Sequence, residues 1–390
     1  KFVMRRAVPV GLVVVTLLIL LGLPFAGVKW GYPDDRVLPQ SASAYEVGNE
    51  LRTSFAASTD TAVTVVIPDA VGLAQADIER YAAELSRVPD VSLVAAPTGT
   101  FVGGKMAGPP AAATGAADGS AFLTVASTAP LFSDASEAQL VNLHAVAGPG
   151  GRTVDMTGVA QVNRDSVDAI TSRLPLVLGI IAVITFALLF LLTGSVVLPL
   201  KALVLNILSL TAAFGALVWI FQDGHLGALG TTSTGTLVAN MPVLLFCIAF
   251  GLSMDYEVFL VSRIREYWLA SGQTRADNDE SVALGLARTG RVITAAALVM
   301  SISFAALIAA QVAFMRMFGL GLTLAVLVDA TLVRMVLVPA FMHVLGRWNW
   351  WAPKPLVWLH HKIGISESGE DKRAPVSVGL IGQTSGNRVP

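Results

Sequence analysis

Six long apolar runs constrain the fold of this 390-residue chain more than any other feature. Each run holds about 20 residues, the length of an α-helix that crosses a hydrocarbon layer roughly 30 Å thick. With 54% hydrophobic and only 14% charged residues, the chain is also too apolar for an ordinary soluble domain. The runs are Val8–Val28, Leu174–Thr193, Leu198–Phe221, Asn240–Val261, Val292–Ala310 and Phe318–Leu345. The sequence therefore predicts a membrane α-helical bundle with one span (residues 1–28), a long gap, and five spans within residues 174–345.

Charges between the spans predict the orientation of the bundle, because Lys and Arg accumulate in short cytoplasmic loops. Lys1, Arg5 and Arg6 precede the first span, and the loop 262–291 carries five arginines, whereas 222–239 has none. We therefore expect both termini in the cytoplasm, the spans in the inner membrane, and residues 29–173 in the periplasm. Four tryptophans in 346–365 predict an interfacial segment, and the polar tail 366–390 is expected to be disordered.

The long segment 29–173 has the periodicity of a folded domain. Alternating or β-branched stretches predict strands, and amphipathic stretches predict helices, in the order βαββαβ. That order is the α+β ferredoxin-like arrangement. The glycine-rich stretch Gly103–Gly119 is expected to be a mobile loop, and a helix from near Val159 is expected to run directly into the second span.

The fourth apolar run carries the clearest functional signal, because ionised carboxylates are costly inside a membrane and are usually functional there. Its residues Leu252, Asp255, Tyr256 and Phe259 follow the spacing i, i+3, i+4, i+7 and form one stripe, flanked by Ser253 and Glu257. Asp255 could bind and release a proton, and the Tyr256 hydroxyl could hydrogen-bond a carboxylate on another helix. The alternative is an Asp255 held permanently by fixed hydrogen bonds.

Three further charges lie in or near the apolar layer. Asp329 and Arg334, in the sixth run, are five residues apart, which is about 140° around an α-helix. They are therefore expected on different faces, each paired with a neighbouring helix. Glu257 is expected to have either a structural or an interfacial role.

Several classes of function are excluded or disfavoured by composition. The net charge of −1 divides into −7 for residues 29–173 and +6 for the remainder, and it disfavours nucleic-acid binding. Cys247 is the single cysteine, and the histidines lack metal-ligand spacing, so neither a metal nor a cofactor is expected. No phosphate-binding G-x-x-x-x-G-K-[ST] loop is present, so any energy would come from an ion gradient.

Four motifs, in order and at the expected spans, carry a family resemblance. They are Gly31-YPDDRVLP-Gln40, Phe250-GLSMDYEVFLVSRIREY-Trp268, Thr289-GRVITAAA-Leu298 and Leu327-VDATLVRMVLVPAFMH-Val344. Together they make the chain similar, as far as about Trp351, to the second half of the MmpL (mycobacterial membrane protein large) lipid transporters. These transporters belong to the resistance-nodulation-division superfamily.

The resemblance implies a porter-like role for residues 29–173 and a proton path through Asp255 and Tyr256. Ser253, Glu257, Asp329 and Arg334 would support that path, and Leu252 and Phe259 would lie beside it. The partner Asp-Tyr pair would come from a first half that this chain lacks, so a fragment or one part of a split protein is expected. The implied activity is proton-driven export of long-chain envelope lipids, such as mycolic-acid-type glycolipids or wax esters, together with accessory envelope proteins.

Two other functions are compatible with parts of the sequence. An intramembrane aspartyl protease would bring Asp255 and Asp329 together to share a proton, although the Gly-Leu-Ser-Met before Asp255 is unlike such enzymes. A sterol- or lipid-sensing receptor would bind lipid without needing Asp255. The sequence names neither the lipid nor the oligomeric state.

Overall fold

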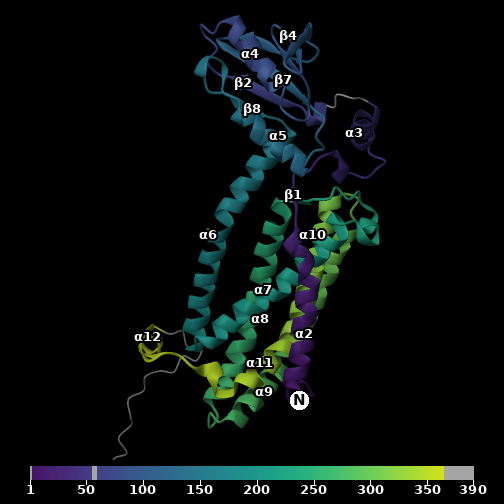
Figure 1. The fold of residues 1–390 in the computed structure, drawn as a ribbon. Coiled ribbons are helices and arrows are strands. Elements are labelled where there is room, and N and C mark those ends of the chain that lie inside the picture. Colours follow the sequence, from purple (N-terminus) through teal and green to yellow (C-terminus); the bar gives the residue numbers. More distant parts are fainter. Residues whose placement is uncertain (1, 55–58, 364–390) are drawn as a thin grey trace, which may run out of the picture.

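The computed structural model describes residues 2–54 and 59–363, so the tail 366–390 expected to be disordered lies outside the described residues. Figure 1 shows a helical bundle with a separate sheet domain above one end of it. The helix α6 (Val159–Thr193) joins the two parts without interruption, which confirms the helix expected from near Val159 into the second span.

Six helices among the described residues are long and apolar enough to cross a membrane, and each overlaps one predicted span. The first is α2 (Ala7–Gly22) with the short turn η1 (Leu23–Gly27), and the second is α6. The next three are α7 (Val197–Leu217) with η5 (Val218–Gln222), α8 (Asn240–Leu269), and α9 (Arg275–Ala305) with η7 (Ala306–Ala309). The last combines α10 (Ala313–Val328), η8 (Asp329–Leu337), α11 (Val338–Leu345) and η9 (Gly346–Trp350).

The segment 262–291, expected to be a loop, is mostly helical. Helix α8 continues to Leu269 and α9 begins at Arg275, so only residues 270–274 connect them. Thr274 and Asp277 form a reciprocal capping box that fixes the start of α9. The expectation was wrong because the end of an apolar run marks where the hydrocarbon layer ends and does not stop the helix.

The centre of the bundle is formed by the third and sixth spans, in which 61% and 56% of the apolar window is buried, against 17% for α6. Leu217, Leu245 and Leu322 from α7, α8 and α10 lie in one core cluster. Helices α2 and α7 approach closely at Gly215, where an added Cβ would overlap the backbone of Leu21 and Gly22. Small residues at such positions let membrane helices pack tightly.

The sheet domain (residues 59–158) has an antiparallel sheet with the order β5-β4-β3-β7-β2-β8 and β6 paired to β7. Its helices α4 and α5 contribute Tyr81 and Leu140 to the same core as Val65 and Leu123 of the sheet. The elements are β2 (Val63–Ile67), α4 (Gln75–Leu85), β3 (Val91–Ala96), β4 (Gly99–Val102), β5 (Lys105–Gly108), β6 (Gly115–Ala117), β7 (Ser120–Ser127), α5 (Asp134–Ala145) and β8 (Asp155–Thr157).

The stretch Gly103–Gly119 contains ordered strands, where a mobile loop was expected. Gly103 and Gly104 take positive φ in the turn between β4 and β5, and β6 follows. Thr100 of β4 holds the segment that follows β5 in place. Its hydroxyl donates to the Pro109 carbonyl at 2.7 Å and accepts from the Ala111 amide at 2.8 Å. These glycines form the turn of a hairpin. A high glycine content is found in such turns and in flexible loops alike, so composition alone does not distinguish the two.

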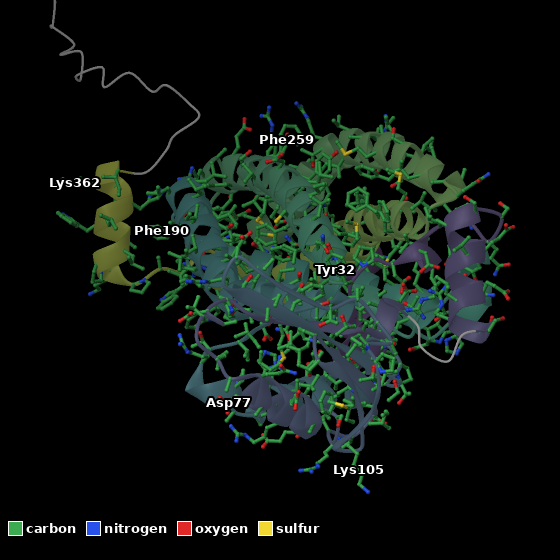
Figure 2. All side chains as sticks on the ribbon, turned by 90° about the horizontal axis from the view of Figure 1, so that it is seen from above. Tyr32, Asp77, Lys105, Phe190, Phe259 and Lys362 are labelled. Carbon is green, nitrogen blue, oxygen red and sulfur yellow. The ribbon has the colours of Figure 1, made fainter. Side chains whose placement is uncertain are left out.

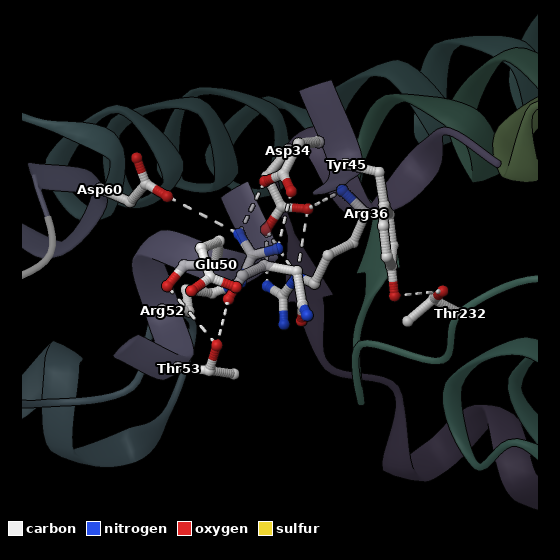
Figure 3. A network of polar contacts seen from close by, with 10 residues as sticks. Asp34, Arg36, Tyr45, Glu50, Arg52, Thr53, Asp60 and Thr232 are labelled. Carbon is white, nitrogen blue, oxygen red and sulfur yellow. Dashed lines mark hydrogen bonds and ion pairs between the residues drawn. The ribbon is translucent and has the colours of Figure 1, made fainter. Parts of the chain in front are cut away.

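The motif Gly31–Gln40 and the helix α3 (Ser43–Ser54) form a polar clasp at the membrane end of the sheet domain, shown in Figure 3. Two guanidinium nitrogens of Arg52 donate to the two carboxylate oxygens of Asp35, at 2.8 and 2.6 Å. This bond lowers the pKa of Asp35. Asp34 accepts from the Arg36 backbone amide and pairs with its guanidinium at 2.6 Å. The strand β1 (Trp30–Gly31) pairs with β9 (Leu237–Val238) and so attaches the clasp to the bundle.

Candidate functional site

A buried charge cluster lies at the centre of the helical bundle. It consists of Lys201 from α7, Glu257 from α8, and Asp329 and Arg334 from η8, whose exposed fractions are 8%, 4%, 6% and 1%. Two cations and two carboxylates balance one another. Buried charges are tolerated inside a membrane bundle when they are paired in this way.

Arg334 is the hub of this cluster. Its Nε donates to Asp329 Oδ2 at 2.8 Å, and its Nη1 lies 3.5 Å from Glu257 Oε2. Its Nη2 donates to the backbone carbonyl and to the hydroxyl of Ser253. The guanidinium also lies over the Tyr256 ring, 5.5 Å from its centroid, at cation–π distance. One side chain thereby connects the sixth span to α8.

The prediction that Asp329 and Arg334 point to different faces was wrong. The chain from Asp329 to Leu337 is a π-helix, in which residue i bonds to residue i+5. In that winding a five-residue separation is close to one full turn, so the two side chains lie on one face and form an ion pair. The i, i+5 spacing was judged by α-helical geometry, which does not apply in this segment.

Glu257 is buried and paired with cations, as a structural role requires. Its Oε1 lies 3.9 Å from the Lys201 ammonium, and its Oε2 faces Arg334. Sequence reasoning missed Lys201 altogether. The sequence does mark this residue, because Lys201 is a single cation inside the apolar run Leu198–Phe221.

Asp255 lies on the opposite side of α8 from this cluster. Its side chain is exposed, and among the described residues no hydrogen bond or ion pair to it is found. Leu252 and Tyr256 are half-buried and pack against the bundle, whereas Asp255 and the 43% exposed Phe259 face away from it. Viewed along the bundle in Figure 2, Phe259 lies at the edge of the molecule. Within this chain, therefore, Asp255 is not held by fixed hydrogen bonds.

Tyr256 lies between the exposed Asp255 and the buried cluster. Its hydroxyl donates to Met300 Sδ at 3.3 Å, while its ring contacts Arg334. Ser253, one turn earlier, is buried and bonded to the same arginine. The predicted residues thus form two groups on two sides of α8, and Tyr256 is shared by both.

A small cavity of about 10 Å³, with both polar and apolar walls, adjoins Tyr256 and Asp329. It is also lined by Asn206, Ser209 and Ser253, and its size suits about one water molecule. Both polar atoms of the Asn206 amide are buried without a hydrogen-bond partner in the described chain. Hydroxyl, amide and carboxylate groups around one water could pass a proton along α8.

Neither a metal centre nor a carboxylate pair for proteolysis is assembled here. Among the described residues, no group of three or more His, Cys, Asp or Glu could hold a metal ion. Asp329 is paired to Arg334, whereas Asp255 is exposed on the other side of α8, so the two carboxylates do not share a proton. This arrangement argues against the aspartyl protease alternative.

Comparison with known proteins gives one consistent family. The model of the MMPL family matches residues 36–362. The chain is 39% identical to a membrane protein of Streptomyces coelicolor, over 94% of this chain and 48% of that protein. It is 32% identical to the trehalose monomycolate exporter MmpL3 of Mycobacterium tuberculosis, over 97% of this chain and 41% of the exporter. It is 41% identical to the heme uptake protein MmpL11 of the same species, over 54% of this chain and 21% of that protein. The chain thus spans less than half the length of these relatives.

Proposed function

This chain belongs to the MMPL family of membrane transporters, and from that premise we propose that it forms half of a proton-driven exporter of long-chain envelope lipids. A relative named as a trehalose monomycolate exporter supports lipid as the cargo. A glycolipid bearing a mycolic acid, or a wax-type ester, is the class proposed. The observation that carries the proposal is that one membrane helix, α8, has an exposed carboxylate, Asp255, on one side and contributes Glu257 to a neutral buried charge cluster on the other.

In this proposal residues 29–173 are a periplasmic porter domain and both termini are cytoplasmic, with the bundle in the inner membrane. The strand order β3-β7-β2-β8, all antiparallel, supports a ferredoxin-like domain, extended by the hairpin β4–β5. Helix α6 joins this domain to the bundle as one continuous helix. Movement of the bundle could therefore open and close a path for lipid tails in the porter domain.

The proposed coupling step is protonation of Asp255. Its exposed face on α8 would be covered by the other half of the transporter, whose own Asp-Tyr pair would meet Asp255 and Tyr256. A proton removes the charge on Asp255 and weakens that contact, which shifts the bundle between two packings. A proton moving down the membrane potential provides about 2.3 kcal/mol per 100 mV, enough to bias such a switch substantially. Accessory envelope proteins would receive the lipid.

The test is Asp255→Asn in the full-length transporter, with lipid export measured in membrane vesicles under an imposed pH gradient. We expect proton-dependent export to be lost while expression and thermal stability are unchanged, since Asp255 makes no contact that holds this bundle. Glu266→Gln, near the inner end of the same helix, is the matched control and should export normally. Unchanged export by Asp255→Asn would refute the coupling role. If the wild-type protein bound lipid but did not export it in response to the gradient, and Asp255→Asn still bound lipid, the lipid-sensing alternative would be favoured.

A further inference from the structure

A large cavity lies at the end of the bundle opposite the sheet domain. Its volume is about 820 Å³; it is open to the outside and is bordered by the ends of α6 and α8, by η9, and by the helix α12 (Lys354–Ile363). Figure 1 shows α12 standing off the side of the bundle at this end. The lining residues that matter here are Arg265, Trp268, Arg347, Trp348, Trp351 and His360. We call this space the tryptophan-lined cavity.

The walls of the cavity are held in place by buried polar contacts. Asn349 is fully buried, and its Nδ2 donates to the carbonyls of Met342 and Gly346 at 2.7 Å. The hydroxyl of Ser195 donates to the Asn349 carbonyl at 2.5 Å. These bonds fasten η9 to the start of α7. The wall that η9 contributes is therefore fixed to the bundle.

The aromatic walls are also fixed. Trp268 and Trp350 stack with ring centroids 5.2 Å apart, and the Trp350 indole donates to Asn278 Oδ1 at 3.1 Å. Trp348 is 66% exposed and lies at the edge of the cavity. Tryptophan prefers the boundary between hydrocarbon and water, so this edge is suited to the membrane surface.

Positive charge without compensation distinguishes the cavity. None of the residues that line it is Asp or Glu. Arg265 uses its Nε to donate to the Thr193 carbonyl at 3.1 Å, and within the described chain neither it nor Arg347 has an acidic partner. The pKa of His360 is lowered, chiefly by burial and then by Arg265, and its Nε2 has no hydrogen-bond partner among the described residues. The lining thus offers guanidinium donors and a neutral imidazole to a bound anion.

Helix α12 has the character of a helix that lies on a membrane. Trp358 is 64% exposed, and the Lys362 ammonium lies 5.3 Å from the centre of its ring. His360 points the other way, toward Phe190 of α6, with ring centroids 6.0 Å apart. In Figure 2, Phe190 lies near the side of α12 that faces the bundle. The helix thereby closes one side of the cavity with a polar group and presents an apolar surface outward.

We propose that the tryptophan-lined cavity binds the phosphate headgroup of an anionic membrane phospholipid. The guanidinium groups of Arg265 and Arg347 would bind the phosphate oxygens, and the exposed tryptophans would lie beside the glycerol and the first carbons of the chains. Basic pockets between membrane helices at a membrane surface are suited to such headgroups, and the planar guanidinium is suited to phosphate. The site lies at the end of the bundle opposite the sheet domain, and the inference does not depend on the identity of the exported cargo.

The experiment uses the full-length protein in nanodiscs of phosphatidylcholine that contain a small fraction of phosphatidylglycerol, with bound lipid counted by native mass spectrometry. We expect phosphatidylglycerol to be retained in preference to phosphatidylcholine. Arg347→Gln should weaken this retention about fivefold, since a cation near a membrane surface contributes about 1 kcal/mol to binding an anionic lipid. The matched control is Arg291→Gln, an exposed arginine of α9 outside the cavity, and it should retain lipid normally.

Arg265→Gln should weaken retention by a similar factor, but the side chain also bonds the end of α6, so this variant could fail to fold. Arg347 is exposed and makes no such bond, which keeps the test decisive. Equal retention of the two lipids by the wild-type protein, or normal retention by Arg347→Gln, would overturn the proposal. Displacement of phosphatidylglycerol by millimolar inorganic phosphate would also overturn it, because the natural ligand would then be a free anion.

Discussion

Replacing Arg334 by glutamine should destabilise the folded transporter more than any exposed arginine substitution. The change leaves Asp329 and Glu257 buried with Lys201 as the remaining cation of the cluster, so the cluster passes from neutral to a charge of −1. It also removes the donors that bond Asp329 and Ser253. Breaking a buried ion pair by removing one partner costs about 3–5 kcal/mol. That corresponds to roughly a 100- to 5,000-fold change in the unfolding equilibrium.

The assay is denaturant unfolding of the full-length protein in mixed micelles, followed by helical circular dichroism. Arg334→Gln is compared with Arg291→Gln, an exposed arginine whose loss should change stability by about 0.5 kcal/mol or less. Expression should fall for the first variant and stay normal for the second.

A double variant distinguishes charge imbalance from lost packing. Arg334→Gln with Asp329→Asn restores a neutral cluster, because the remaining pair is Lys201 with Glu257. Residues in direct contact couple by about 0.5–3 kcal/mol, so the double variant should recover that much of the loss. If Arg334→Gln costs less than about 1 kcal/mol, or if the double variant is no more stable than the single one, the electrostatic account of the cluster is refuted.

Three further predictions concern other parts of the molecule. Gly215→Ala should lower thermal stability, because its Cβ would overlap the backbone of α2, whereas Gly179→Ala, with nothing within 4 Å, should leave stability unchanged or raise it by up to about 1 kcal/mol. The Arg52 bond lowers the pKa of Asp35 below its ordinary 3.8, so the stabilisation is complete above pH 3.8 and is lost as pH falls through the lowered value. The free energies of unfolding of wild type and Arg52→Gln should therefore differ by about 1–3 kcal/mol at pH 7, and this difference should shrink as pH falls below 3.8. Tyr256→Phe removes only a weak bond to sulfur, so the melting temperature should hold within a few degrees, while proton-driven export in vesicles should fall; normal export would exclude the hydroxyl from the proton path.

The positions of the spans could be predicted from sequence because the hydrocarbon layer sets a minimum apolar length for each helix. The grouping of Leu252, Asp255 and Phe259 on one side of α8 was predictable for a similar reason, since the α-helical period is fixed. Which way that stripe faces was not predictable. The answer depends on which helices pack against α8, and those contacts join residues far apart in the sequence.

The buried charge cluster shows the same limit more sharply. Lys201, Glu257 and Arg334 come from three helices, and only their packing reveals that they neutralise one another. The pairing of Asp329 with Arg334 depends in addition on the π-helical segment, which no hydrophobic pattern in this chain marks. A search for isolated charges inside apolar runs would have found Lys201, and a search at i+5 spacing would have found the Asp329 pair.

One side of α8 carries Glu257, whose charge is paired inside the bundle, and the other side carries Asp255, which has no partner in the described chain. Glu257 and Ser253 contact Arg334 inside the bundle, so substitutions there should reduce folding and function together. Asp255, two residues from each of them and on the other side of the helix, has no partner in the described chain, so its substitution should reduce function alone. Measuring stability and export for both sides therefore tests the division directly. If Asp255→Asn destabilised the full-length protein as much as Arg334→Gln, Asp255 would be a structural residue of the interface with the other half.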